Sequence, residues 1–138
     1  MKKEKEVAQK VYYYKLLEEN LKTLIAMKES EENKLKLIKN AIEILKKLDY
    51  TDCLIPITDS LFVKAKILDK EKFLINVGHN VLLEKNLKQS IEFLENSEKE
   101  VSTNLQRLER EINQLYITYK SLEFDIRKRS EEIKKESG

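Results

Sequence analysis

The chain has 138 residues, of which 38% are charged, and it contains two glycines, one proline and no tryptophan. This composition argues against a compact globular domain, because chains rich in Glu, Lys, Leu and Ile form long helices that bury a narrow seam. The formal net charge of +2 provides no general attraction to nucleic acid or to a membrane surface.

The N-terminal residues 1–10 have no apolar run behind their lysines, so we expect no export or transit signal. No apolar run approaches the ~18 residues of a membrane-spanning helix, and no membrane partner is expected. The single cysteine, Cys53, cannot form an internal disulfide, which indicates a reducing compartment. We therefore expect a cytoplasmic protein, with the nucleus as an alternative location.

The first helix is expected at residues 4–48, a segment without proline or glycine. Apolar residues recur there at alternating steps of three and four, which is the repeat of a coiled-coil seam. Lys28 and Glu31 interrupt the seam with polar side chains. The apolar seam residues are Tyr14, Leu17, Leu21, Leu24, Leu35, Ile38, Ile42 and Leu45.

Two β-hairpins are expected in residues 51–85, which contain Pro56 and the only internal glycine, Gly78. Apolar and polar residues alternate in the runs 61–67 and 73–77, which is the period of a strand with one buried face. The change from helical to strand periodicity therefore marks an insert between two helices.

Turns are expected at residues 69–71 and 78–80, and residues 54–57 suit a strand entry or an edge strand. Two small hairpins cannot build an independent core, and their exposed edges pair readily with other chains. We expect the insert to join subunits. The predicted assembly residues are Leu61, Val63, Ile67, Phe73, Ile75, Val77, Val81 and Leu83.

The second helix is expected at residues 86–134, where the seam repeat is more regular and only Glu98 and Arg129 interrupt it. Its apolar seam residues are Leu94, Val101, Leu105, Leu108, Ile112, Leu115, Tyr119, Leu122, Ile126 and Ile133. Two helices of similar length favour antiparallel pairing, with Tyr14 near Lys120. The predicted fold is mainly α: one domain, 1–138, forming a long antiparallel coiled-coil hairpin with two central β-hairpins.

Antiparallel pairing places both chain termini at the same end of the hairpin. One seam cannot bury the three consecutive tyrosines at positions 12–14, so at least one of them faces outward.

No catalytic, metal or cofactor site is expected. His79 lies in a predicted turn without partners at metal or catalytic spacing, and Cys53 has no neighbouring base and is expected in a linker. The sequence has no glycine-rich phosphate loop. The basic residues 127–129 are diluted by acidic neighbours, so no nucleic-acid partner is expected.

The insert, DSLFVKAKILDKEKFLINVGHNVLLEKNL at residues 59–87, resembles the hairpin region of α-class prefoldin subunits. The family patterns D-N-L-Y-x-K-A and G-x-N-V-M-L-E correspond to residues 59–65 and 78–84. Residues 14–21 resemble the family's Y-K-x-x-E-x-N-L, and residues 103–115 resemble its T-x-N-L-x-x-L-E-x-x-L. Within the family the insert is most similar to the eukaryotic subunit 3 group, and the subunit 5 group is the second choice.

The resemblance implies a heterohexamer of two α-class and four β-class prefoldin subunits, in which the hairpins form an intersubunit β-barrel. It also implies that the coiled coils hold unfolded proteins such as actin and tubulin for a group II chaperonin, without nucleotide or another cofactor. The chain would then be no enzyme. A coiled-coil scaffold or adaptor without chaperone activity is the alternative.

Unfolded chains bind exposed apolar and aromatic side chains, and the resemblance therefore makes the residues near the termini candidates for client binding. These candidate client-binding residues are Val7, Val11, Tyr12, Tyr13, Tyr14, Tyr116, Ile117 and Phe124. The alternative is that these side chains broaden the seam or meet a neighbouring coil.

Overall fold

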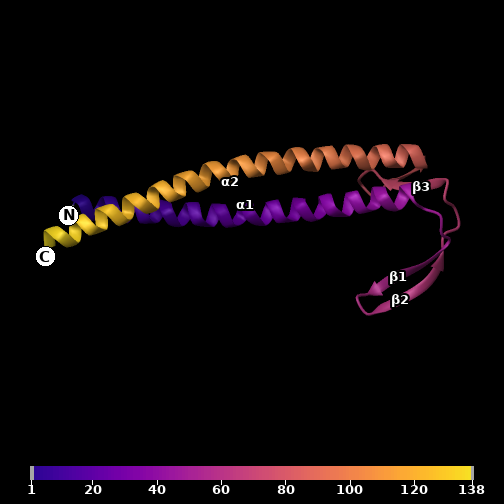
Figure 1. Ribbon diagram of the computed structural model, residues 1–138, viewed down its shortest axis with the longest axis horizontal. Coiled ribbons are helices and arrows are strands. Elements are labelled where there is room, and N and C mark those ends of the chain that lie inside the picture. Colours follow the sequence, from indigo (N-terminus) through magenta and orange to yellow (C-terminus); the bar gives the residue numbers. More distant parts are fainter. Residues whose placement is uncertain (1, 138) are drawn as a thin grey trace. The chain divides into compact units, whose positions relative to one another are not determined.

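A computed structural model describes residues 2–137 and contains two long helices and two small antiparallel hairpins (Figure 1), which confirms the predicted fold class. The elements are α1 (Lys2–Lys46), β1 (Asp52–Thr58), β2 (Leu61–Lys66), β3 (Lys72–Asn76), β4 (Leu82–Asn86) and α2 (Leu87–Ser137). Two compact units make up the chain. One combines residues up to 33 with residues from 102 onward, and the other covers residues 34–101.

The ends of the helices differ by up to three residues from the expected ranges. In α1 the last turn tightens, because the Lys47 amide donates to the carbonyls of both Glu43 (3.1 Å) and Ile44 (3.3 Å). At the start of α2, the Asn86 carboxamide accepts a hydrogen bond from the Gln89 amide (2.8 Å) and the Gln89 side chain accepts one from the Asn86 amide (3.2 Å). This reciprocal capping box explains why α2 begins at Leu87.

The unit that contains both chain termini is a two-helix coil around a thin core. Its most buried side chains are Leu21, Leu105 and Leu108, and Leu108 is only 1% exposed. Every apolar seam residue predicted in this unit is buried or half-buried. The heptad pattern therefore identified the face along which the two helices pack.

The helices of this unit run antiparallel, as the contacts between their side chains show. The hydroxyl groups of Tyr14 and Tyr119 lie 2.6 Å apart, and Lys10 forms an ion pair of 2.9 Å with Asp125. The sequence placed Tyr14 beside Lys120, one residue from its observed partner. The register was predictable because both helices carry long, nearly uninterrupted repeats.

The polar interruption of the α1 seam coincides with a small cavity of about 140 Å³ in the same unit. Glu31 and Leu108 are among the residues that line it, together with residues of both helices. Polar groups at seam positions pack less tightly than leucines, and the local void is the expected consequence.

In the unit of residues 34–101, Ile42 of α1 and Ser90 of α2 are buried, with 7% and 3% of their surface exposed. The Ser90 hydroxyl donates to the Asn86 carbonyl at 2.8 Å, so its burial leaves no unpaired polar group. The hairpins add little to this core, because most of their large apolar side chains are exposed.

The first hairpin pairs β1 with β2, and the second pairs β3 with β4, in two separate two-stranded sheets. Residues 54–57, expected as a strand entry or an edge, lie in β1, which is an edge strand because its sheet has only two strands, and Pro56 lies opposite Phe62. A register shift follows Pro56, because proline cannot donate a hydrogen bond to the ladder. The turn of this hairpin is Asp59-Ser60, which the sequence analysis did not identify.

The predicted turn at residues 69–71 joins the two hairpins. The Asp69 carboxylate accepts hydrogen bonds from the amides of Glu71 (2.8 Å) and Lys72 (3.1 Å), and the first of these lowers the pKa of Asp69 most. This side chain therefore stabilises the entry into β3.

The predicted turn at residues 78–80 closes the second hairpin. Gly78, His79 and Asn80 have φ values of 110°, 52° and 59°. A side chain at Gly78 would meet no neighbour, but its backbone conformation is strained for any other residue. His79 is an exposed residue of this turn, as predicted.

Candidate binding surfaces

The β1–β2 ribbon has one predominantly apolar face. Side chains alternate between the two faces of a strand pair, so residues directly opposite each other share a face. The apolar face consists of Cys53, Ile55, Leu61, Val63 and Ala65, with Thr58 opposite Leu61 at its end. The other face is mixed and consists of Asp52, Leu54, Pro56, Phe62, Lys64 and Lys66.

Much of the apolar face is open to solvent. Leu61, Val63 and Ile55 are 57%, 47% and 48% exposed. Such a ribbon is marginal in water, because two strands cannot cover their own apolar side chains. The face can therefore bind another apolar surface, which is what the predicted assembly role of Leu61 and Val63 requires.

The predicted assembly residues of the second hairpin differ from one another in exposure. Phe73 and Ile75 are half-buried, whereas Val77, Val81 and Leu83 are exposed. Ile75 lies opposite Leu83 in the β3–β4 ladder, so these two share one face. The remaining predicted residue, Ile67, is half-buried just after β2, where its amide donates to the Thr51 carbonyl at 2.6 Å.

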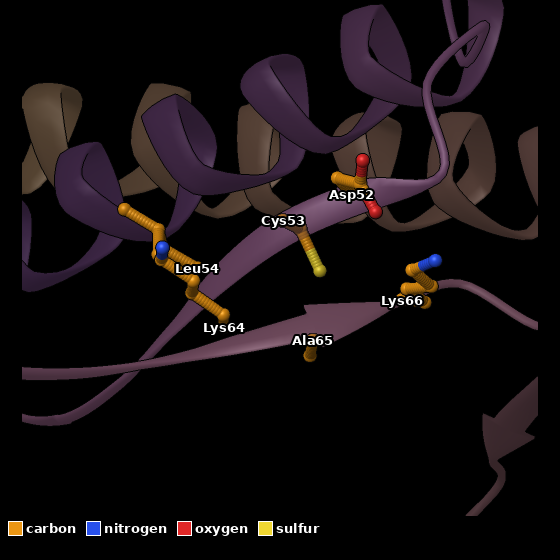
Figure 2. A pocket seen from close by; sticks show the side chains of 6 residues that line it. All are labelled: Asp52, Cys53, Leu54, Lys64, Ala65 and Lys66. Carbon is orange, nitrogen blue, oxygen red and sulfur yellow. The ribbon is translucent and has the colours of Figure 1, made fainter.

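The β1–β2 hairpin also borders an open cavity of about 780 Å³ (Figure 2). Its lining consists of Asp52, Cys53, Leu54, Lys64, Ala65 and Lys66. Cys53 lies within β1 and not in a linker, which corrects the prediction, and Figure 2 shows its thiol pointing toward Ala65 of β2. Among residues 2–137 no group of acidic, His or Cys side chains is suited to hold a metal ion.

The predicted client-binding residues lie in the unit that contains the termini, and they fall into two groups. Val7, Val11 and Tyr14 are half-buried along α1. The others are strongly exposed: Tyr12 64%, Tyr13 64%, Tyr116 50%, Ile117 69% and Phe124 67%. The second group is thus available for contact with another molecule.

Tyr14 and Tyr119 form a clasp between the two helices. Their rings stack with centroids 4.5 Å apart and planes 15° apart, and their hydroxyls share a hydrogen bond. The hydrogen bond with Tyr14, followed by partial removal from water, raises the pKa of Tyr119 to about 12. Tyr116 extends this aromatic group, since its ring lies 6.5 Å from Tyr119 and Lys120 approaches it at 5.6 Å.

We expect the raised pKa of Tyr119 to make the clasp sensitive to alkali. The protonated phenol is favoured in the folded state, so its contribution is complete below the ordinary pKa of ~10 and is lost as the pH rises toward 12. Ultraviolet titration of phenolate should show one late-ionising tyrosine, which returns toward the ordinary range in Tyr14→Phe. Tyr12→Phe is the control, and a late component that survives Tyr14→Phe would contradict the assignment.

Beyond the clasp, toward the termini, ion pairs join the two helices. Lys10 pairs with Asp125 at 2.9 Å, Arg129 pairs with Glu6 at 2.5 Å, and the same region contains a pair between Lys3 and Glu136 (2.6 Å). The hydrogen bond from Lys10 lowers the pKa of Asp125, and the bond to Glu136 raises the pKa of Lys3.

These ion pairs were not predicted from the sequence, although a signal for them was present. Continuing the seam repeat back from Tyr14 places Lys10 and Lys3 at seam positions, and continuing it forward from Ile126 places Arg129 and Glu136 there. Lys3 and Glu136 pair between two seam positions, whereas Lys10 and Arg129 pair with Asp125 and Glu6, which lie next to the seam.

None of the described helices is long and apolar enough to cross a membrane.

Residues 12–132 match the family model described as prefoldin subunit. Two curated relatives are named prefoldin subunit alpha. The protein from Thermofilum pendens is 33% identical over 79 residues, which are 57% of this chain and 61% of that protein. The protein from Methanoregula boonei is 33% identical over 82 residues, 54% of each chain.

The chain therefore spans less than two thirds of the length of these curated relatives. Among solved structures, it shares its fold with a chain in the cryo-EM structure of filamentous PFD from Methanocaldococcus jannaschii. The TM-score is 0.65 at 21% identity, and the match covers 83% of this chain and 96% of that one. Since the family model matches both helices and both hairpins, the chain belongs to the prefoldin family.

Proposed function

We propose that the chain is an α-class subunit of a hexameric co-chaperone that holds unfolded proteins without consuming nucleotide. The observation that carries this proposal is the solvent-exposed apolar face of the β1–β2 ribbon, since a subunit built for assembly must leave such a face uncovered. The two hairpins and the names of the curated relatives support the α class. In this proposal the chain has no enzymatic activity.

In the proposed assembly, the hairpins of two α-class and four β-class subunits complete one another in an intersubunit β-barrel. Leu61 and Val63 would face its interior, because they lie on the apolar face of the ribbon. Full burial of an aliphatic side chain contributes about 1.5–3 kcal/mol, so a few such residues per subunit are enough to drive association. Closure into a barrel also removes exposed strand edges.

The proposed client-binding surface is formed by the exposed aromatic residues near the termini. Tyr12, Tyr13 and Phe124 present large apolar areas, which are what an unfolded chain can bind. Family resemblance supports actin and tubulin as clients, a group II chaperonin as the recipient and the cytoplasm as the location. It also favours the subunit 3 group over the subunit 5 group, because Lys64-Ala65 follows the pattern of the former.

We expect the combined substitution Tyr12→Ser, Tyr13→Ser and Phe124→Ser to weaken suppression of client aggregation several-fold. The apolar contact area is lost, while the hairpins that join the subunits are untouched. Light scattering of a chemically denatured client measures the first effect, and native mass spectrometry of the complex with β-class subunits measures the second. The matched control is Leu37→Ser with Ile44→Ser, exposed residues of α1 outside the terminal unit.

Unchanged suppression in the triple variant would remove the client role from these residues. A chain that binds no β-class subunit would overturn the chaperone assignment as a whole. The exposed ribbon face could also mediate self-association, and a homo-oligomer without client-holding activity would then favour the scaffold or adaptor function.

A further inference from the structure

The coiled-coil seam changes its chemistry at the Tyr14–Tyr119 clasp. On one side of the clasp, the seam contains buried leucines such as Leu21 and Leu105. On the other side, toward the termini, charged residues occupy several seam positions and pair across the helices. Ion pairs therefore contribute to closing the terminal part of the seam, in addition to its apolar contacts.

The three terminal ion pairs are partly open to solvent. The two side chains of each pair are exposed by 25% and 52% for Lys10–Asp125, 41% and 50% for Arg129–Glu6, and 55% and 61% for Lys3–Glu136. Exposed ion pairs are weakened by dissolved salt, because the screening length shortens from ~30 Å at 0.01 M to ~3 Å at 1 M ionic strength. Packing of buried leucines has no such dependence on salt.

The clasp itself is built from uncharged contacts, since Tyr14 and Tyr119 meet by ring stacking and by one hydrogen bond. Its response to salt is therefore small. We expect that separation of the two helices, when it starts at the termini, ends at the clasp. Between the clasp and the termini, half-buried apolar residues lie along the seam: Val7, Leu122, Ile126 and Ile133.

We propose that the three terminal ion pairs form a salt-sensitive latch that closes the end of the coil and limits access to its apolar seam. When the latch opens, the seam residues Val7, Leu122 and Ile126 become available to an unfolded client, in addition to the aromatic residues that are always exposed. Opening of the latch is independent of the proposed chaperone function, whereas its effect on clients rests on that function.

Distances between spin labels on the full-length chain test the latch directly. With Cys53→Ser as the background, one reporter pair is placed beside the latch, Ala8→Cys with Ser130→Cys. A control pair lies on the leucine side of the clasp, Thr23→Cys with Asn113→Cys. Raising NaCl from about 20 mM to about 1 M should broaden the distance distribution of the first pair roughly twofold and leave the second unchanged.

Charge variants separate the latch from general effects of salt. Lys10→Asp should open the reporter pair at low salt, and adding Asp125→Lys should close it again. Lys10→Leu with Arg129→Leu places leucines at seam positions and should keep the end closed at every salt concentration. Circular dichroism verifies that each variant is helical. A wild-type distribution that is the same at both salt concentrations, or a Lys10→Asp variant that stays closed, would overturn the proposal.

Client binding is then compared between the wild type and the dileucine variant at the same salt concentration. If the latch controls access, the dileucine variant suppresses aggregation less well at high salt, and the difference disappears at low salt. Equal suppression at high salt would overturn the step that links the latch to clients. The proposed function fails separately, if neither protein suppresses aggregation under any condition.

Discussion

Val63→Asp should abolish assembly with partner subunits, whereas Lys64→Asp should leave it intact. Val63 lies opposite Ile55 on the apolar face of the β1–β2 ribbon, and Lys64 lies opposite Leu54 on the mixed face. Burying an unpaired carboxylate costs several kcal/mol, which corresponds to an affinity loss of at least ~100-fold. Native mass spectrometry of chains co-expressed with β-class subunits measures the result.

The two variants differ by one position in the same strand and gain the same side chain, so strand propensity and added charge are matched. Circular dichroism of both proteins verifies that the helices remain folded. Intact assembly of both variants would show that the apolar face is not the interface. Loss of assembly in both would instead indicate that the interface extends to the mixed face.

Leu108→Ala should lower the free energy of unfolding by about 2–5 kcal/mol. Among the described residues, Leu108 has the least exposed side chain, at 1%. It lines a cavity of about 140 Å³, and its truncation enlarges that cavity. Neighbouring side chains have few ways to fill the space, because the helices are long and held in register at many points. Urea unfolding followed by the helical circular dichroism signal measures the change.

Ile117→Ala provides the control on the same helix, because Ile117 is 69% exposed. Its effect should stay within about 0.5 kcal/mol, as is usual for surface positions. If both variants lose a similar amount of free energy of unfolding, Leu108 does not contribute more to stability than an exposed residue.

The helices and their register could be predicted from the sequence because a coiled coil is specified locally. Each seam residue can be identified by its spacing from the next one. The observed burial of Leu21, Ile42, Leu105 and Leu108 follows that spacing. The pairing of Tyr14 was predicted to within one residue, since two breaker-free helices leave few alternative alignments.

The first strand was predicted only in part, because Pro56 indicated an edge strand but not the register shift that follows it. The ladder tolerates this proline by shifting its register immediately afterwards, which depends on the partner strand and not on local sequence. The ion pairs near the termini posed a similar difficulty. Lys10 and Asp125 are 115 positions apart in the sequence, so their contact becomes visible only once the helices are aligned.

The exposed aromatic residues show another limit. Their exposure follows from the heptad pattern, because Tyr12 and Tyr13 precede the seam residue Tyr14. Which molecule they contact depends on partners and clients, and a pattern of apolar spacing in one chain has no information about the surfaces of others. The client role of these residues therefore stays a prediction that the serine variants address.

The alternating signs of the terminal charges also favour one alignment of the two helices over others. Along α1 the order is Lys3, Glu6, Lys10, and each meets the opposite sign on α2. Sliding one helix by about a turn would bring Lys10 against Arg129, and the resulting repulsion disfavours the slipped alignment. In the proposed assembly of several such coils, this order of charges would favour pairing of each helix with the other helix of its own chain.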